Sequence, residues 1–297
     1  MEPEYMDQFI QSILLPGLSQ GAIYGLIAVA FAVLHLTTGV INFGHGQLVV
    51  LAPIVILLSA AAGVPVWLAF LFGFAALLIA ALVTEVVAIR PFVQSGSAVS
   101  WILSTFGVSI VLTEILAIPA GGEATYFPFG IPSTPFTFLG FRVSWAELAT
   151  LPVLLLVAAA LLVFYRRTRV GRELRAVGQD VRGAEALGIS RARASQITVL
   201  ISAVIAAITG YLVASSQILM PNLGIFFLFY GFVAVSMGGM SSVPGAVIGG
   251  VVVGLVSQGA AVYIGPLYGN LAVFVLLVLV YVVRPHGIFG SRPVREV

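Results

Sequence analysis

Residues 39–47, GVINFGHGQ, form the stretch of this sequence whose composition is best suited to binding a polar solute. Three polar side chains, Asn42, His45 and Gln47, are interleaved with glycines between two long apolar runs. Non-helical backbone at membrane depth survives only where it is buried in protein or lines a cavity. The unpaired N–H and C=O groups of such a break can bind a solute. The same residues also suit an ordinary cytoplasmic turn that caps a helix, and at this point both interpretations stay open.

Several kinds of chemistry are excluded by residue types that are absent. All 13 basic residues are arginine, so the chain has no P-loop lysine and cannot hydrolyse ATP by that route. Cysteine is absent as well, which excludes disulfides and thiolate nucleophiles. With three histidines in all, and no carboxylate at helical spacing from His45, we predict neither a metal site nor a cofactor. No catalytic motif is present, and we expect no enzyme.

A second candidate feature is the arginine-rich segment 166–193. Within it, residues 180–187 can form two turns of helix, because Asp180 suits an N-cap and Gly188 suits a helix stop. A short helix held outside the bilayer is a natural docking surface for another protein. The alternative is a solvated loop that only fixes the topology.

Two carboxylates, Glu85 and Glu114, fall inside apolar runs and are therefore candidates for ion coupling. Both lie within a turn or two of a predicted helix end. Glu85 can reach Arg90, and Glu114 can reach the outer edge of the membrane. We therefore expect neither to couple transport to an ion.

The elements that position these residues follow from composition. Hydrophobic residues make up 60% of the 297 residues and charged ones 8%, against about 25% charged in soluble domains. The chain is therefore an integral membrane protein in a lipid bilayer. At roughly 20 apolar residues per span, we predict a single all-α domain, residues 1–297: a polytopic helix bundle of about eight to ten spans with Gly-rich broken helices. Nine apolar runs are visible, at residues 9–36, 47–62, 64–89, 99–120, 146–165, 194–218, 223–240, 243–264 and 267–283.

The positions of the arginines orient this bundle. Positive charge concentrates on the cytoplasmic side of membrane proteins, which puts segment 166–193 in the cytoplasm. Nine spans then place the acidic N-terminus and the proline-rich loop 121–145 outside and the C-terminus inside. All arginines but Arg142 lie on the inner side. A faint repeat, YGLIAVA at 24–30 and YGFVAVS at 230–236, is a candidate two-fold repeat of the kind found in transporters, although so short a match also arises by chance.

Four motifs, in order along the chain, resemble the Liv-type permeases, the membrane subunits of ABC importers for branched-chain amino acids. They are residues 21–26 with 39–46 (GAIYGL and GVINFGHG), 184–189 (AEALGI), 238–246 (GGMSSVPGA) and 284–290 (RPHGIFG). The NFGHGQLV run resembles the first of the two permease types, since the second reads SLGHAAFF there. Gly44 and Ser241 depart from the usual Ala and Gly, which weakens inference about the substrate more than inference about the class.

The resemblance implies a bacterial inner-membrane transport subunit with a cytoplasmic C-terminus, whose partners are a second permease subunit, two ABC ATPase subunits and a periplasmic or extracellular solute-binding protein. No nucleic acid is implied. The translocation path is expected at Tyr24, Asn42, Phe43, His45 and Gln47, and the ATPase coupling loop at Asp180, Arg182, Glu185, Leu187 and Gly188. Related permeases carry urea, short amides or small carboxylates, which are alternative substrates. An ion-coupled secondary transporter is the rival class.

Overall fold

The computed structural model describes residues 3–93, 98–138, 140–284 and 287–289, and it is a bundle of helices. Each of the nine apolar runs forms helix. In chain order the elements of these runs are α1 Pro3–Phe9, the π-helical turn η1 Ile10–Leu14, α2 Leu15–Thr38, α3 His45–Ala61, α4 Val66–Thr84, the π-helical turn η2 Glu85–Ile89, α5 Arg90–Val93, α6 Ala98–Ala120, α7 Trp145–Arg167, α10 Arg191–Ser216, α11 Leu223–Gly238, α12 Val243–Tyr263 and α13 Tyr268–Val283.

Fewer helices than expected are long enough to cross a bilayer. In the described part of the chain, six helical stretches have the length and apolarity of a span: Met6–Thr38, Val66–Phe92, Val99–Ala120, Trp145–Arg167, Arg191–Ser216 and Val243–Tyr263. The other three apolar helices, α3, α11 and α13, have 17, 16 and 16 residues. A 16-residue helix is about 24 Å long, shorter than the hydrocarbon core of about 30 Å. The expected eight to ten spans are therefore not confirmed, because turns between the runs shorten these three helices.

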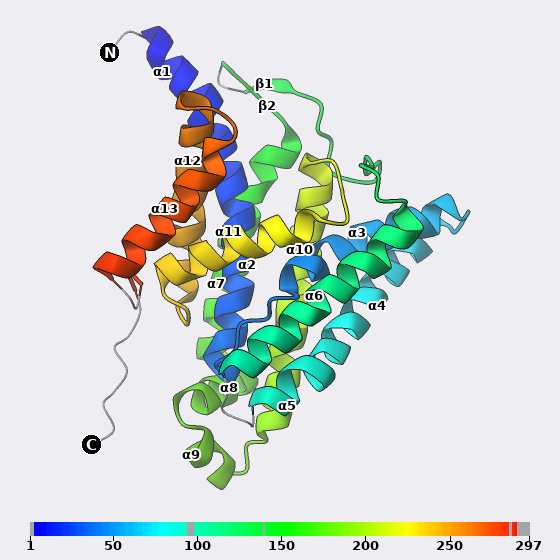
Figure 1. Cartoon of the computed structure of the whole chain (residues 1–297), viewed down its shortest axis with the longest axis vertical. Coiled ribbons are helices and arrows are strands. Elements are labelled where there is room, and N and C mark those ends of the chain that lie inside the picture. Colours follow the sequence, from blue (N-terminus) through cyan, green and yellow to red (C-terminus); the bar gives the residue numbers. More distant parts are fainter. Residues whose placement is uncertain (1–2, 94–97, 139, 285–286, 290–297) are drawn as a thin grey trace.

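Helix α2 runs through the centre of the bundle, with α7, α10, α11 and α12 packed around it (Figure 1). Its residues are apolar on all sides, as expected for a helix without a solvent face. Glycines let α12 approach closely: a Cβ at Gly250 would meet the backbone of Gly25, and one at Gly254 would meet that of Gly21. Small residues at this spacing are a common basis of helix packing in membranes.

The two ends of the bundle differ in structure. At one end, α8 Arg169–Gln179 and α9 Val181–Ala186 lie near α5 (Figure 1). At the other end, a hairpin of β1 Phe136–Phe138 and β2 Phe141–Val143 lies on the same side as α1. The hairpin pairs Phe136 with Val143 in an antiparallel register. The proline-rich loop 121–145 thus contains local structure that its composition did not predict.

Helix α8 was not anticipated within the arginine-rich segment. The Thr168 hydroxyl caps it by accepting a hydrogen bond from the Gly171 N–H (2.9 Å). Its apolar side, Leu174 and Val177, is buried. Gly178 contributes too, since a Cβ there would meet the carbonyl oxygen of Leu36 in α2. The segment is therefore packed against the bundle as two helices.

The first of the two intramembrane carboxylates is neutralised by an ion pair. Glu85 is fully buried, and both of its oxygens accept hydrogen bonds from the Arg90 guanidinium, at 3.2 and 3.0 Å. The expected contact between Glu85 and Arg90 is present, across the π-helical turn η2. Glu114 lies on an exposed part of α6.

Candidate functional site

The break after α2 is formed by specific backbone geometry. Gly39 adopts a left-handed conformation (φ +71°), and its N–H donates to the carbonyl of His35 at 2.9 Å. The next N–H, of Val40, donates to the Thr38 hydroxyl oxygen at 3.2 Å. A left-handed glycine is a common helix stop. From there the chain is non-helical until α3 begins.

Asn42 organises the break. Its side-chain oxygen accepts a hydrogen bond from the Gly44 N–H (2.9 Å), and its backbone carbonyl accepts one from the His45 N–H (3.0 Å). This is an Asx turn, in which a short amide side chain takes the place of a backbone acceptor. The Asn42 side chain is buried. It therefore satisfies backbone donors that the interruption of the helix leaves free.

The break lies well inside the bundle and is not a surface turn. His45 Nδ1 lies 3.3 Å from the Ser202 hydroxyl, and the His45 ring lies 5.4 Å from that of Phe31. Helix α10 begins at Arg191, and Ser202 is eleven residues further on. Ser202 therefore lies about 16 Å from the start of that helix. Phe31 precedes the end of α2 by seven residues, about 10 Å. The structure thus favours a break at membrane depth over a loop outside it.

Unpaired polar atoms collect at the start of α3. Both side-chain polar atoms of Gln47 and the Nε2 of His45 are buried without a hydrogen-bond partner among the described residues. Gln47 lies at a close helix crossing, since a Cβ at Gly224 would come within 2.5 Å of its amide oxygen. Leaving a buried polar group unpaired costs about 1–3 kcal/mol. A cluster that is retained at such a cost is a candidate for binding something in another state of the protein.

The other two predicted path residues lie in aromatic contacts. Tyr24 stacks on Tyr230, with ring centroids 4.3 Å apart and an interplanar angle of 9°. The Tyr230 hydroxyl donates to the Asn270 side-chain oxygen. Phe43 lies against Trp101 and Phe232, at centroid distances of 6.3 and 6.0 Å. Tyr24 is seven residues before Phe31 in α2, so the tyrosine stack lies about 10 Å along α2 from the contact of Phe31 with His45, toward the hairpin end.

Helix α11 connects these groups, which sequence reasoning did not anticipate. It lies across the long axis of the bundle (Figure 1). Its Gly224 contacts Gln47, its Tyr230 stacks on Tyr24, and its Phe232 contacts Phe43. The signal was present in the faint repeat, because Tyr24 and Tyr230 are the first residues of its two copies.

The predicted docking helix is present as α9. Its two ends differ in how their backbone and capping hydrogen bonds are made. Gly188 is left-handed (φ +82°), and the Ile189 N–H reaches back to the Ala184 carbonyl at 3.0 Å. This matches the expected helix stop. Asp180 occupies the N-cap position as predicted, although its side chain accepts no capping hydrogen bond. Its carboxylate lies over Gly183 instead.

The predicted coupling residues are exposed, and one of them also borders a cavity. Leu187 is 82% exposed, and Arg182 and Gly188 are exposed as well. Glu185 is exposed too, and it borders a cavity together with residues of α2 and α10. All five predicted coupling residues, Asp180 among them, are therefore exposed at or beside α9.

Replacing Asn42 tests its role in holding the break. Asn42→Leu leaves the buried Gly44 N–H without its acceptor, so we expect the stability of the permease to fall by about 1–3 kcal/mol and its transport to fall with it. Asn42→Ser retains a short acceptor and should be intermediate. Thermal unfolding of the purified protein measures the effect. An Asn42→Leu protein with wild-type stability would show that the Asx turn is not required.

Comparisons with known proteins place this chain in a family. Residues 13–283 match the family model described as the branched-chain amino acid transport system permease component. The chain is 31% identical over 299 residues to the high-affinity branched-chain amino acid transport system permease protein BraD of Pseudomonas aeruginosa, covering 96% of this chain and 97% of that protein. The corresponding protein LivH of Escherichia coli K12 is 30% identical over 305 residues, covering 95% and 96%.

A structural comparison agrees at the level of the fold. A solved structure of a metal-chelate type ABC transporter in an inward-facing conformation superposes with a TM-score of 0.53 at 16% identity, covering 95% of this chain and 89% of that one. The two chains thus share a fold. The chain belongs to the branched-chain amino acid permease family.

Proposed function

We propose that this chain is the permease subunit of an ATP-driven importer in a bacterial inner membrane, and that it carries branched-chain or related small amino acids. Family membership and the names of the relatives support this class of substrate. The observation that carries the proposal is the buried break, where Asn42, His45 and Gln47 place polar groups between apolar helices. Polar groups at membrane depth typically mark substrate pathways.

The translocation path then passes the break and the tyrosine stack. In the present structure Asn42, His45 and Gln47 are 3%, 1% and 0% exposed, so this part of the path is closed. Opening requires α3 and α11 to separate at the Gly46–Gly224 crossing, where a Cβ at Gly46 would meet the Gly224 carbonyl. Separation would present the unpaired Gln47 amide and His45 Nε2 to the solute. Tyr24 and Phe43 would form the apolar walls on either side.

The arginine-rich end is the cytoplasmic end in this proposal, and α9 is where an ATPase subunit docks. The exposed surface is provided by Asp180, Arg182, Glu185, Leu187 and Gly188, and Glu185 also borders the cavity beside α10. A second permease subunit, two ATPase subunits and a solute-binding protein complete the importer. The ATPases supply the hydrolysis for which this chain has no lysine. The C-terminus lies on the same cytoplasmic side.

The rival secondary-transport mechanism has less support. It requires an ionisable group free to exchange an ion with the path, and Glu85 is held by both oxygens to Arg90. Urea, short amides and small carboxylates remain alternative substrates, because the break contains neutral polar groups that suit them as well.

Uptake into proteoliposomes tests the proposal. The complete importer is reconstituted with ATP inside and the solute-binding protein outside, and uptake of radiolabelled L-leucine and urea is compared. We expect ATP-dependent uptake of leucine that requires every subunit. Uptake of urea alone would assign the alternative substrate. Uptake by this chain by itself, driven by a proton or sodium gradient, would contradict the proposal.

A further inference from the structure

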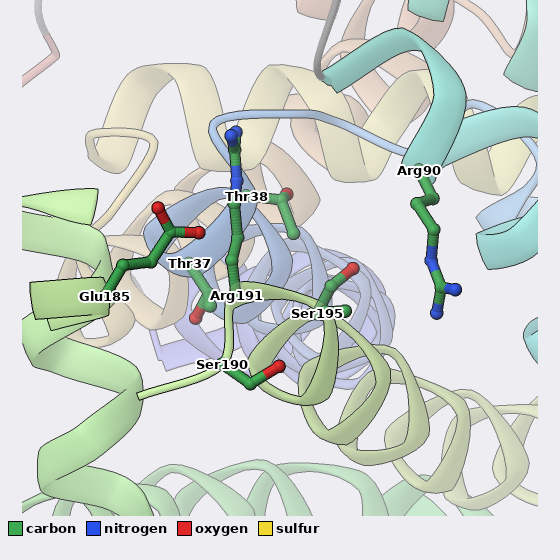
Figure 2. A pocket seen from close by; sticks show the side chains of 8 residues that line it. Thr37, Thr38, Arg90, Glu185, Ser190, Arg191 and Ser195 are labelled. Atoms are coloured by element: carbon green, nitrogen blue, oxygen red, sulfur yellow. The ribbon is translucent and has the colours of Figure 1, made fainter. Parts of the chain in front are cut away.

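A cavity lies at the arginine-rich end of the bundle, beside the end of α2. Its volume is about 390 Å³, and it is bounded by the end of α2, by Arg90, by α9 and by the start of α10 (Figure 2). The lining residues are Thr37, Thr38, Arg90, Glu185, Ser190, Arg191, Ala192 and Ser195. Nearly all of them carry a hydroxyl or a charge. Ala192 is the exception, and the methyl groups and aliphatic stems of the other side chains also face the cavity.

The charges that border the cavity differ in whether they are already paired. Arg90 is held by Glu85, with its Nη2 3.0 Å from a carboxylate oxygen. Glu185 and Arg191 form no ion pair within the described ranges, although both side chains extend into the same space from α9 and α10 (Figure 2). The cavity therefore presents one free carboxylate and one free guanidinium.

These two free charges define the chemistry of a ligand. A guanidinium binds a carboxylate through parallel N–H donors, and a carboxylate accepts hydrogen bonds from an ammonium group. The Arg191 end of the cavity is also the N-terminus of α10, whose first N–H groups favour a negative charge. The hydroxyl of Ser190 already accepts the Arg193 N–H at 3.4 Å and has its own proton left to donate. The lining thus matches a small zwitterion.

We propose that this cavity is a cytoplasmic binding site for a free α-amino acid, with its carboxylate at Arg191 and its ammonium group at Glu185. The inference rests on the proposed function, since it assigns the transported class of solute to a second site. Because Glu185 belongs to α9 and Arg191 to α10, a bound amino acid ties the docking helix to the bundle. Amino acid accumulating in the cytoplasm would thereby restrain α9 and slow ATP hydrolysis.

Binding of L-leucine to the purified importer tests this site. The permease complex with its ATPases is placed in nanodiscs of phosphatidylglycerol, without the solute-binding protein, and titrated with L-leucine by calorimetry. We expect saturable binding that lowers the ATPase rate. Arg191→Gln and Glu185→Gln should each weaken it at least about tenfold, the effect of losing roughly 1.4 kcal/mol. Arg193→Gln, which removes an exposed charge two residues further along α10 and outside the cavity lining, is the matched control and should bind leucine normally.

Leucine analogues and the lipid composition of the nanodisc test whether the ligand of this cavity is an amino acid. Leucinamide lacks the carboxylate and 4-methylpentanoate lacks the ammonium group, so neither should compete with leucine. A lipid with an ethanolamine headgroup carries the same two charges. If leucine binds only when phosphatidylethanolamine is absent from the nanodisc, the cavity is a headgroup site and the proposal is wrong.

Two outcomes distinguish this inference from the proposed function. Leucine import at normal rates without Arg191-dependent binding would refute the cytoplasmic site alone. An importer that fails to carry any amino acid would refute the proposed function. The Gln47→Leu variant distinguishes leucine bound in the translocation path from leucine bound in the cytoplasmic cavity. It should abolish binding in the path and leave binding in the cavity unchanged.

Discussion

Gln47→Leu should leave the permease at least as stable as the wild type while reducing transport by about tenfold or more. Both polar atoms of the Gln47 side chain are buried without a partner in the described structure. Replacing an unpaired buried amide with an apolar side chain of similar size removes its desolvation cost of about 1–3 kcal/mol. If the amide meets the solute during transport, the same change removes a contact that the solute needs.

Thermal unfolding and uptake, measured on the same preparation, separate these effects. Gln258→Leu is the matched control, because the Gln258 amide donates to the Ser12 carbonyl at 3.0 Å, outside the proposed path. We expect this control to lose stability and to keep its transport rate per folded molecule. A Gln47→Leu protein that is destabilised yet transports normally would show that Gln47 serves the fold and not the path.

Leu187→Asp should abolish coupling without unfolding the permease. Leu187 is 82% exposed at the end of α9, where a large apolar side chain has no stabilising role within the chain. In the proposed docking helix this side chain can become buried against an ATPase subunit, which would stabilise the contact. A carboxylate there would be buried without a partner in the ATPase interface. We therefore expect the ATPase subunits to be lost on purification, with solute-stimulated ATP hydrolysis reduced to the background rate.

Val170→Asp provides the comparison for this experiment. Val170 is 36% exposed in the first turn of α8, in the same arginine-rich segment, and a carboxylate at a helix start is favourable. This variant should retain its ATPase subunits. If Leu187→Asp copurifies with the ATPases and remains coupled, α9 is not the docking element. Equal losses in both variants would point to a general effect of added negative charge.

The helices and the break were predictable because each is encoded by local sequence. Uninterrupted apolar runs define helices that can lie in lipid, and the glycines on either side of Asn42 interrupt one of them. The Gly188 stop was likewise visible, since only glycine adopts its left-handed backbone without strain. The contact between Glu85 and Arg90 followed from their spacing of five residues within one predicted helix.

Other features depend on contacts between distant segments, which a single sequence does not reveal. The stack of Tyr24 on Tyr230 joins residues from opposite ends of the chain. The crossing of α3 and α11 depends on Gly224, whose position gave no sign of its partner Gln47. The expected number of spans is not confirmed because hydropathy measures how apolar a run is, and α3, α11 and α13 are apolar without being long.

Helix α10 is long and straight enough to tilt as a rigid body. It has 26 residues and no internal proline, and it is thus a rod of about 39 Å. Its first residues border the cytoplasmic cavity, Ser202 near its middle contacts His45, and Ser215 near its far end accepts the Ile131 N–H of the proline-rich loop at 3.0 Å. If the rod pivots at its middle, a tilt of about 10° moves each end by roughly 3 Å in opposite directions. A push on the docking helix would then loosen the outer loop without bending any helix.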